Sequence, residues 1–159
     1  MISFSAGGPT GDFYRDAMIL ANDLDTVGHG IKSFRDPLIK SVREVIIPSI
    51  RQNFVAEGRP QWAPLSPQTV RTRKASGPIL DRTGRLLKVA TQFNIWHYTK
   101  DSATITGLDS RVSYAKYHQG GTSKMPQRPF VLIQREDEVE VEEIFYEWVD
   151  ERIRKLGRL

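Results

Sequence analysis

The stretch from residue 136 to residue 157 constrains the fold most, because its apolar residues recur with the period of an α-helix. Acidic residues crowd its first turns and Arg152, Arg154 and Lys155 its last, and both arrangements are favourable for the helix dipole. Gly157 is placed to end the helix. One face collects the large apolar residues, which are Val141, Ile144, Phe145, Trp148, Val149, Ile153 and Leu156. The stretch therefore predicts a C-terminal amphipathic helix with one buried face.

A second long helix is predicted between Asp36 and Gly58. Asp36 followed by Pro37 is typical of an N-cap residue and the first residue of a helix. The apolar residues that follow are spaced by three and four, and they are Leu38, Val42, Val45, Ile46, Ile50 and Phe54. Pro48 lies inside this pattern, so we expect one bent helix. Nearer the N-terminus, residues 2–5 predict a short strand and residues 12–27 a helix.

The middle of the chain predicts a connector and a small sheet. Three prolines lie within residues 58–70, and proline disrupts helix interiors and central strands, so we expect an extended connector over residues 59–79. A short helix is expected at 82–90. Alternating residues in 92–98 and 103–108 predict a β-hairpin, and residues 128–133 predict another strand.

These elements predict an α+β fold, in which long helices, including the C-terminal amphipathic helix, pack on a small, mostly antiparallel sheet. The length of 159 residues suits one domain. We therefore expect a single domain over residues 1–159, with an extended Pro-rich and basic connector at about 58–79.

Composition and motifs argue against an enzyme. The chain has no cysteine, which excludes a disulfide framework, a thiolate metal site and a thiol nucleophile. The three histidines are far apart, and none has a second histidine at i+3 or i+4, so no metal-binding pattern arises. Neither a phosphate-binding loop nor a G-x-S-x-G motif occurs. We expect no catalytic residue, no metal and no cofactor. The N-terminus does not resemble a signal peptide, so we expect a soluble product of the cytoplasm.

The charged residues are unevenly distributed along a chain with a net charge of +4. Of the 19 acidic residues, nine lie between Glu136 and Glu151. The segment 71–88 holds six basic residues and one acid, Asp81. Such a pattern suits nucleic acid, a neighbouring subunit of opposite charge, or simply a solvated face. Because the basic segment contains no aromatic residue, base stacking is not supported, and only sequence-independent phosphate binding remains as the nucleic-acid alternative.

Several separated motifs together resemble the phage virion morphogenesis proteins, which are the tail-completion or head–tail joining proteins of Mu-like and P2-like bacteriophages. The resemblance runs from a helix ending in Phe through Trp-x-Pro-Leu, a basic stretch, Ile-Leu and Thr-Gly-x-Leu to Tyr-Ala-x-x-His-Gln and Arg-Pro-Phe. It covers about half of the chain. The matching residues are Phe54, Trp62, Pro64, Leu65, Thr69, Lys74, Ile79, Leu80, Thr83, Gly84, Leu86, Tyr114, Ala115, His118, Gln119, Arg128, Pro129 and Phe130.

The resemblance implies a structural virion protein without catalytic activity. Such a protein completes the tail or joins the tail to the head at the neck, as a ring-forming homo-oligomer that contacts neighbouring neck and tail proteins. It is made in the host cytoplasm and located in the virion, at the head–tail junction. Within the structural class the alternative is a tail terminator that caps the tail tube. The alternative from another class is a sequence-independent DNA-binding module.

The connector and the basic segment 71–88 supply the candidate interface residues, which are Trp62, Pro64, Leu65, Arg71, Arg73, Lys74, Arg82 and Arg85. Tryptophan is enriched at interface hot spots, and flanking prolines reduce the entropy lost on docking. The alternative is that Trp62 and Leu65 fold back over the core of their own domain. The basic segment has three interpretations. It meets the acidic start of the last helix on the next subunit, it lines a DNA channel, or it becomes ordered only on assembly.

The predicted C-terminal helix can be tested directly. Trp148→Asp places a charge on its apolar face, so we expect this substitution to unfold the domain. Thermal melting followed by circular dichroism measures the effect. A melting curve unchanged from that of the wild-type protein would refute the predicted packing of the helix.

Overall fold

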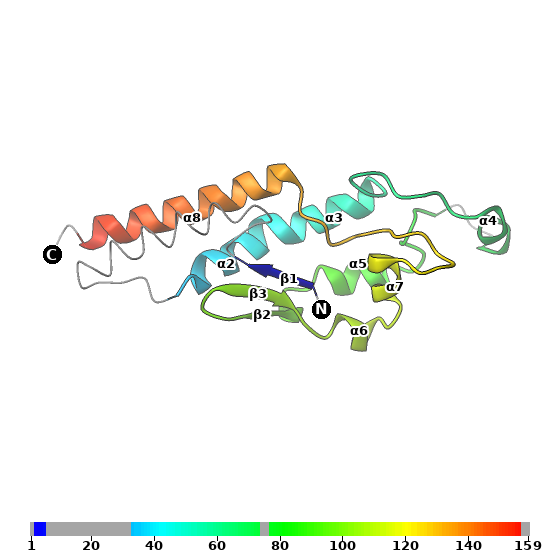
Figure 1. The fold of residues 1–159 in the computed structure, drawn as a ribbon, viewed down its shortest axis with the longest axis horizontal. Coiled ribbons are helices and arrows are strands. Elements are labelled where there is room, and N and C mark those ends of the chain that lie inside the picture. Colours follow the sequence, from blue (N-terminus) through cyan, green and yellow to red (C-terminus); the bar gives the residue numbers. More distant parts are fainter. Residues whose placement is uncertain (1, 6–32, 74–76, 157–159) are drawn as a thin grey trace.

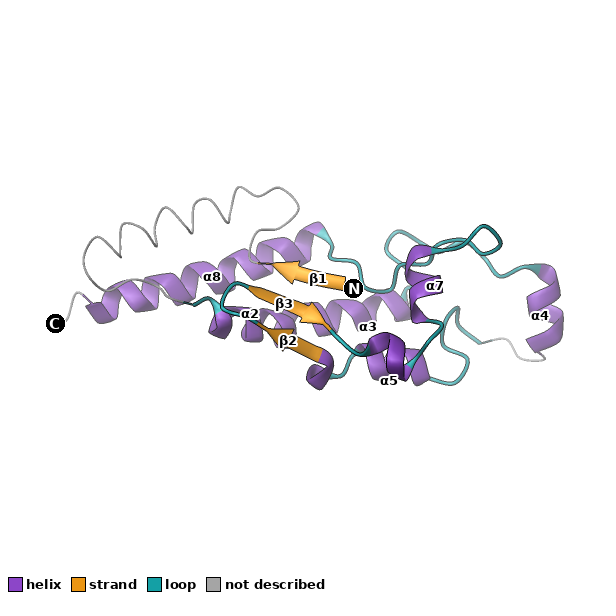
Figure 2. Ribbon diagram, turned by 60° about the horizontal axis from the view of Figure 1, so that its bottom comes forward, coloured by secondary structure: helices purple, strands orange, loops and turns teal. Residues whose placement is uncertain are grey.

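The structure is a computed structural model that describes residues 2–5, 33–73 and 77–156 (Figure 1). The helix predicted at 12–27 lies outside the described residues. The described chain is elongated, with the long helices and the sheet toward one end and short helices and loops toward the other (Figures 1 and 2). The architecture is α+β, as predicted.

Three antiparallel strands form the sheet, in the order β1–β3–β2. The strands are β1 (Ile2–Ser5), β2 (Trp96–Tyr98) and β3 (Ser102–Ile105). Ile105 at the end of β3 is paired with Ile2 on one side and with Trp96 on the other. The predicted strand 2–5 and the hairpin are confirmed, but the hairpin strands are shorter than expected. Residues Phe93–Ile95 form a 3₁₀-helix, η2, instead of continuing β2.

The first long helix consists of three consecutive segments, α2 (Arg35–Ser41), the π-helix η1 (Val42–Ile46) and α3 (Ile47–Val55). The N–H of Ile47 donates to the carbonyl of Val42, five residues back, immediately before Pro48. Proline cannot donate the usual i−4 bond, and here the regular pattern is also interrupted in the turn before it, by a single-turn π-helix inside the α-helix. The prediction of one helix interrupted near Pro48 agrees with these consecutive segments, and the bend itself stays a prediction.

The start of this helix was predicted two residues too late. The N-cap residue is Phe34, and Asp36 lies inside the first turn. Tertiary contacts explain the difference, because the N–H of Phe34 donates to the carbonyl of Lys100. The Phe34 ring also packs 5.9 Å from the Phe145 ring and 5.8 Å from the Trp148 ring, measured between centroids. This anchoring moves the helix start toward the sheet and α8.

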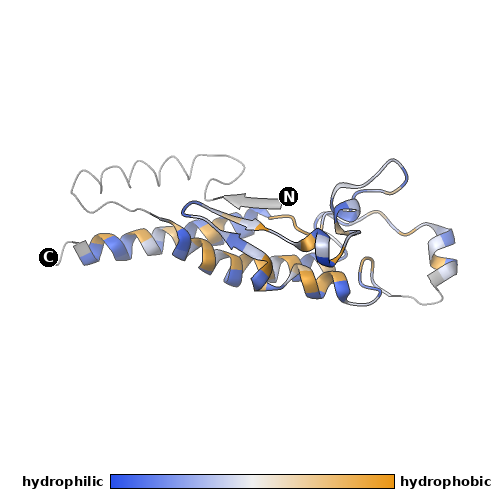
Figure 3. Cartoon of the chain, turned by 90° about the horizontal axis from the view of Figure 1, so that it is seen from below, coloured by the Kyte–Doolittle hydropathy of each residue, from blue (hydrophilic) through white to orange (hydrophobic). Residues whose placement is uncertain are grey.

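The C-terminal helix α8 (Arg135–Leu156) agrees with the prediction. Val141, Ile144, Phe145 and Val149 are buried, and Trp148 packs against the core, whereas Ile153 is exposed. Apolar and polar bands alternate along α8 and α3, as expected for helices with one buried face (Figure 3). Ion pairs Lys40–Glu147 and Arg152–Asp36 connect α8 to α2.

The remaining helices are short. They are α4 (Pro67–Arg73), α5 (Arg85–Ala90), α6 (Leu108–Arg111) and α7 (Ala115–Gly120). The helix expected at 82–90 is confirmed by α5. The extended connector at 59–79 is wrong in part, because α4 lies inside it. The Ser66 hydroxyl accepts a hydrogen bond from the N–H of Thr69 and so caps α4, with Pro67 as the first helical residue.

Tyr98 on β2 makes one prediction about alkaline pH. Burial raises the pKa of the Tyr98 phenol from 10.0 to about 12, although Arg43 and Arg35 act in the opposite direction. The unfolded chain therefore loses this proton at lower pH than the folded chain, so stability is full below pH 10 and falls between pH 10 and 12. We expect Tyr98→Phe to flatten this decline in urea unfolding midpoints.

Tyr117→Phe is the control, because it removes the phenol of an exposed tyrosine on α7. It should leave the alkaline decline as in the wild type. Equal slopes for the wild type and Tyr98→Phe would contradict the role of Tyr98.

Candidate assembly interface

Residues 128–134 cross the core as an extended segment whose backbone is bonded by side chains. The Gln119 Oε1 accepts from the N–H groups of Phe130 and Val131 at 3.2 and 3.1 Å, and its Nε2 donates to the carbonyl of Val131 at 2.8 Å. The Asn53 Nδ2 donates to the carbonyls of Phe130 and Leu132 at 3.1 and 3.2 Å. Two amide side chains thus supply the hydrogen bonds that a neighbouring strand would supply.

The strand predicted at 128–133 is therefore wrong, although the apolar pattern did identify a buried segment. Phe130 is fully buried, and Val131 is buried as well. Buried backbone polar groups need partners. Here those partners come from α3 and α7, so the segment joins no strand among the described residues.

Trp62 folds back over the core of its own chain. Only 4% of its surface is exposed, and its ring meets the Phe54 ring edge-on at 5.8 Å between centroids. Its Nε1 donates to the carbonyl of Pro129 at 3.0 Å. Trp62 therefore folds back over the core of its own domain, which was the alternative to an exposed interface. Its apolar surface is already covered, so it offers little to a partner.

Arg128 holds the two residues that follow Trp62, and these contacts together are called the junction here. Its buried guanidinium donates to the carbonyl of Ala63 at 2.9 Å and to that of Pro64 at 3.0 Å. The Pro64 side chain is exposed, and Leu65 is half-buried against the core. The start of the connector is thus held at three successive residues, 62 to 64, by the Arg128–Pro129 dipeptide.

A buried polar cluster joins α3 to the start of α8. Arg59 donates to Asn53 Oδ1 at 2.9 Å and to Ser49 Oγ at 2.6 Å, and its guanidinium lies 4.0 Å from the Asp137 carboxylate. Asp137 is buried and accepts from Ser49 Oγ and from the N–H of Gln134. The cluster resembles a site in composition, but its polar atoms are engaged in contacts that hold the chain together.

Beyond this junction the chain forms an arm, defined here as residues 65–73. It carries α4, which stands at the far end of the molecule from α8 (Figures 1 and 2). Val70 on α4 is 56% exposed, and Arg71 is exposed too. The chain returns to the core at Ile79, whose N–H donates to Glu57 Oε1 at 2.7 Å and whose side chain is buried. The arm therefore projects from a base that is fixed at both ends.

The other predicted interface residues lie elsewhere. Arg82 and Arg85 are exposed and line a recess of about 340 Å³ together with Leu80, Thr83, Tyr114 and His118. Arg85 also donates to the carbonyl of Arg111 at 2.8 Å. The arm and α5 stand apart in both views (Figures 1 and 2). Arg73 ends α4, and the Arg73 side chain and Lys74 fall outside the described part.

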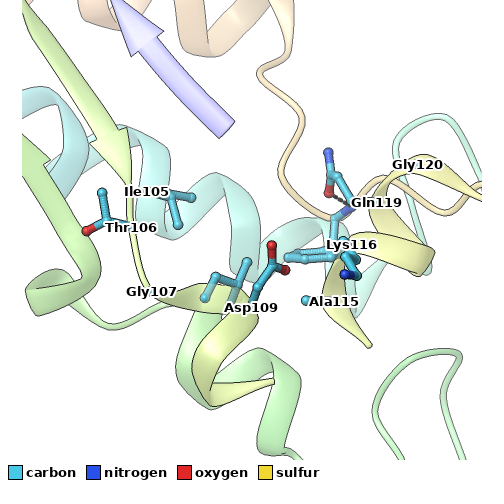
Figure 4. Close-up of a pocket in the computed structure, with 10 residues that line it drawn as sticks. Ile105, Thr106, Gly107, Asp109, Ala115, Lys116, Gln119 and Gly120 are labelled. Atoms are coloured by element: carbon cyan, nitrogen blue, oxygen red, sulfur yellow. Dashed lines mark hydrogen bonds between the residues drawn. The ribbon is translucent and has the colours of Figure 1, made fainter. Parts of the chain in front are cut away.

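A larger recess of about 540 Å³ lies between the end of β3, α6 and α7 (Figure 4). Asp109 and Lys116 lie at this recess, one on α6 and the other on α7. The lining residues are Ile105, Thr106, Gly107, Leu108, Asp109, Ala115, Lys116, Gln119, Gly120 and Phe130. Within the described ranges, no three His, Cys, Asp or Glu side chains are grouped so that they could hold a metal ion.

Comparison with known proteins identifies the family. The sequence model of the phage virion morphogenesis family matches residues 19–150. The chain belongs to this family. The resemblance noted from the motifs is thereby confirmed, and the family indicates a structural protein of the phage virion that interacts with other virion proteins. Searches of the curated proteins and of the solved structures found no match.

Most motif residues of the resemblance turn out to be structural. Phe54, Trp62, Gln119, Arg128 and Phe130 meet around the 128–134 segment. Sequence reasoning missed Asn53 and Arg59, which complete the same network. A signal for Asn53 existed, because a polar residue directly precedes Phe54 at the end of an apolar helical stripe. Among the described residues, no helix is long and apolar enough to cross a membrane.

The network predicts a large effect for Gln119. Gln119→Met keeps a similar size but removes three hydrogen bonds from buried backbone groups, so we expect it to lower the free energy of unfolding by about 2–4 kcal/mol. Gln127→Met is the matched control at an exposed position and should change that free energy by less than about 0.5 kcal/mol. Urea denaturation measures both. Similar values for the two variants would contradict the structural role of Gln119.

Proposed function

We propose that this protein completes the phage tail or joins the tail to the head, and that it acts as a ring-forming homo-oligomer folded as one domain over residues 1–159. The observation that carries the proposal is the family match over residues 19–150. The architecture fits it, because the motif residues hold a compact junction from which an exposed arm projects.

A ring of identical subunits needs two different patches, one meeting the other on the next copy. The chain has such a pair of opposite sign. Acidic residues lie along α8, whereas Arg71 on the arm and Arg82 and Arg85 beside α7 are exposed cations toward the other end (Figure 1). Contacts of this kind favour correct orientation and fast association more than raw affinity.

Deleting the gene from its phage tests the role in the virion. We expect particles to stop at an incomplete stage, with tails of normal length that carry no head, as seen by electron microscopy. A tail terminator instead ends polymerisation of the tube, so its loss should give tails of irregular length. Mass spectrometry of purified wild-type particles should detect the protein.

Complementation with two variants separates assembly from folding. A variant in which residues 65–78 are replaced by a short Gly-Ser linker should fold but fail to restore infectious particles. The Gln127→Met variant should restore them fully. Normal particles in the absence of the gene, or absence of the protein from mature particles, would overturn the proposal. A gel shift that persists at moderate salt would favour the DNA-binding alternative.

A further inference from the structure

The outer face of α8 carries exposed apolar residues at a regular spacing. Val139 and Tyr146 are seven residues apart, which places them on one side of the helix, and Val139 is 48% exposed. These residues lie on a different side from the buried Phe145 and Val149. The helix thus has a second apolar stripe, turned toward solvent.

Two carboxylates lie beside this stripe. Glu140 and Glu143 are exposed, and within the described part of the chain neither forms an ion pair. The acids farther along the helix differ, because Glu147, Asp150 and Glu151 are paired with Lys40, Arg154 and Lys155. The N-terminal half of the outer face is therefore both apolar and negatively charged.

The arm has the complementary chemistry. No acidic residue occurs between residues 58 and 80, whereas Arg71, Arg73 and Lys74 follow one another closely. Val70 is exposed next to Arg71 on α4. The seven residues of α4 rise about 10 Å, which equals the rise from Val139 to Tyr146 along α8. The arm thus matches the outer face of α8 in length and is opposite to it in charge.

We propose that the arm of one copy docks on the outer face of α8 of the next copy, with Val70 against Val139 and Arg71 beside Glu140 and Glu143. The proposal rests on the proposed ring-forming function and specifies its contact. In both views α4 stands well apart from α8, whose start lies near the middle of the molecule, so this contact joins different copies (Figures 1 and 2). Two different patches meet, and such contacts repeat around a ring.

The recess beside α7 is a poorer match for the arm. Its lining is apolar in large part, but it holds one acid, Asp109, and one cation, Lys116, so it offers no net negative charge to Arg71. The outer face of α8 offers apolar contact and attraction together.

Cysteine cross-linking tests the contact cleanly, because the native chain has no cysteine. Chains carrying Val70→Cys are mixed in equal amounts with chains carrying Val139→Cys, and disulfide-linked dimers are followed over time on non-reducing gels. We expect the mixed dimer to form roughly tenfold faster than with Val55→Cys as the partner. Val55 is 85% exposed, so random collision would favour the control.

Charge reversal supplies the second measurement. In the Val70→Cys chain, Arg71→Glu should slow the mixed cross-link roughly tenfold, because like charges then face each other. Adding Glu140→Arg and Glu143→Arg to the Val139→Cys chain should restore the rate. High salt should slow cross-linking between the Val70→Cys and Val139→Cys chains that keep their native charged residues.

The outcomes separate this contact from the function. Equal rates for Val139→Cys and Val55→Cys, or faster cross-linking to Lys116→Cys, would overturn the contact. If the protein is nevertheless found in mature particles, the proposed function stands without it. Preferential cross-linking by a protein that is absent from particles would support the contact and overturn the function.

Discussion

The fold depends on the hydrogen bonds that the backbone N–H and C=O groups of residues 128–134 make in the core. This segment runs through the core, where each unpaired N–H or C=O would cost free energy. Gln119 and Asn53 supply the missing partners from α7 and α3. Because the segment leads directly into α8, its position also determines where the long C-terminal helix starts. Two amides thus hold residues 128–134 to α7, about a dozen residues earlier, and to α3, nearly 80 residues earlier.

The same segment fixes the base of the arm. Pro129 accepts from Trp62, and Arg128 donates to the carbonyls of Ala63 and Pro64. A tryptophan with flanking prolines suggested a docking surface, but the indole is used to seal the junction. What remains outside is α4, which has an apolar and a basic side chain exposed on it. The base of the arm is held by hydrogen bonds within the chain, whereas the arm itself keeps exposed side chains that another molecule could contact.

The buried cluster around Arg59 and Asp137 belongs to the same design. A buried charge is costly unless it is paired and hydrogen-bonded. Here Ser49, Asn53 and the N–H of Gln134 complete the bonding of the pair. These contacts tie the first turn of α8 to Ser49 on α3 and to Arg59.

Periodicity alone determined the long helices, because apolar residues at spacings of three and four share one face only when the chain is helical. It also determined β1, the hairpin and α5, and the motifs identified the family. It could not determine whether residues 128–133 join a strand, since an apolar run reports burial and not the source of hydrogen bonds. Periodicity also could not decide whether Trp62 is buried by a partner protein or by the core of its own chain, because both surfaces are apolar. Only the tertiary structure decided these points, by placing Asn53, Gln119 and Arg128 within hydrogen-bonding distance of backbone groups from 11 to 79 residues away.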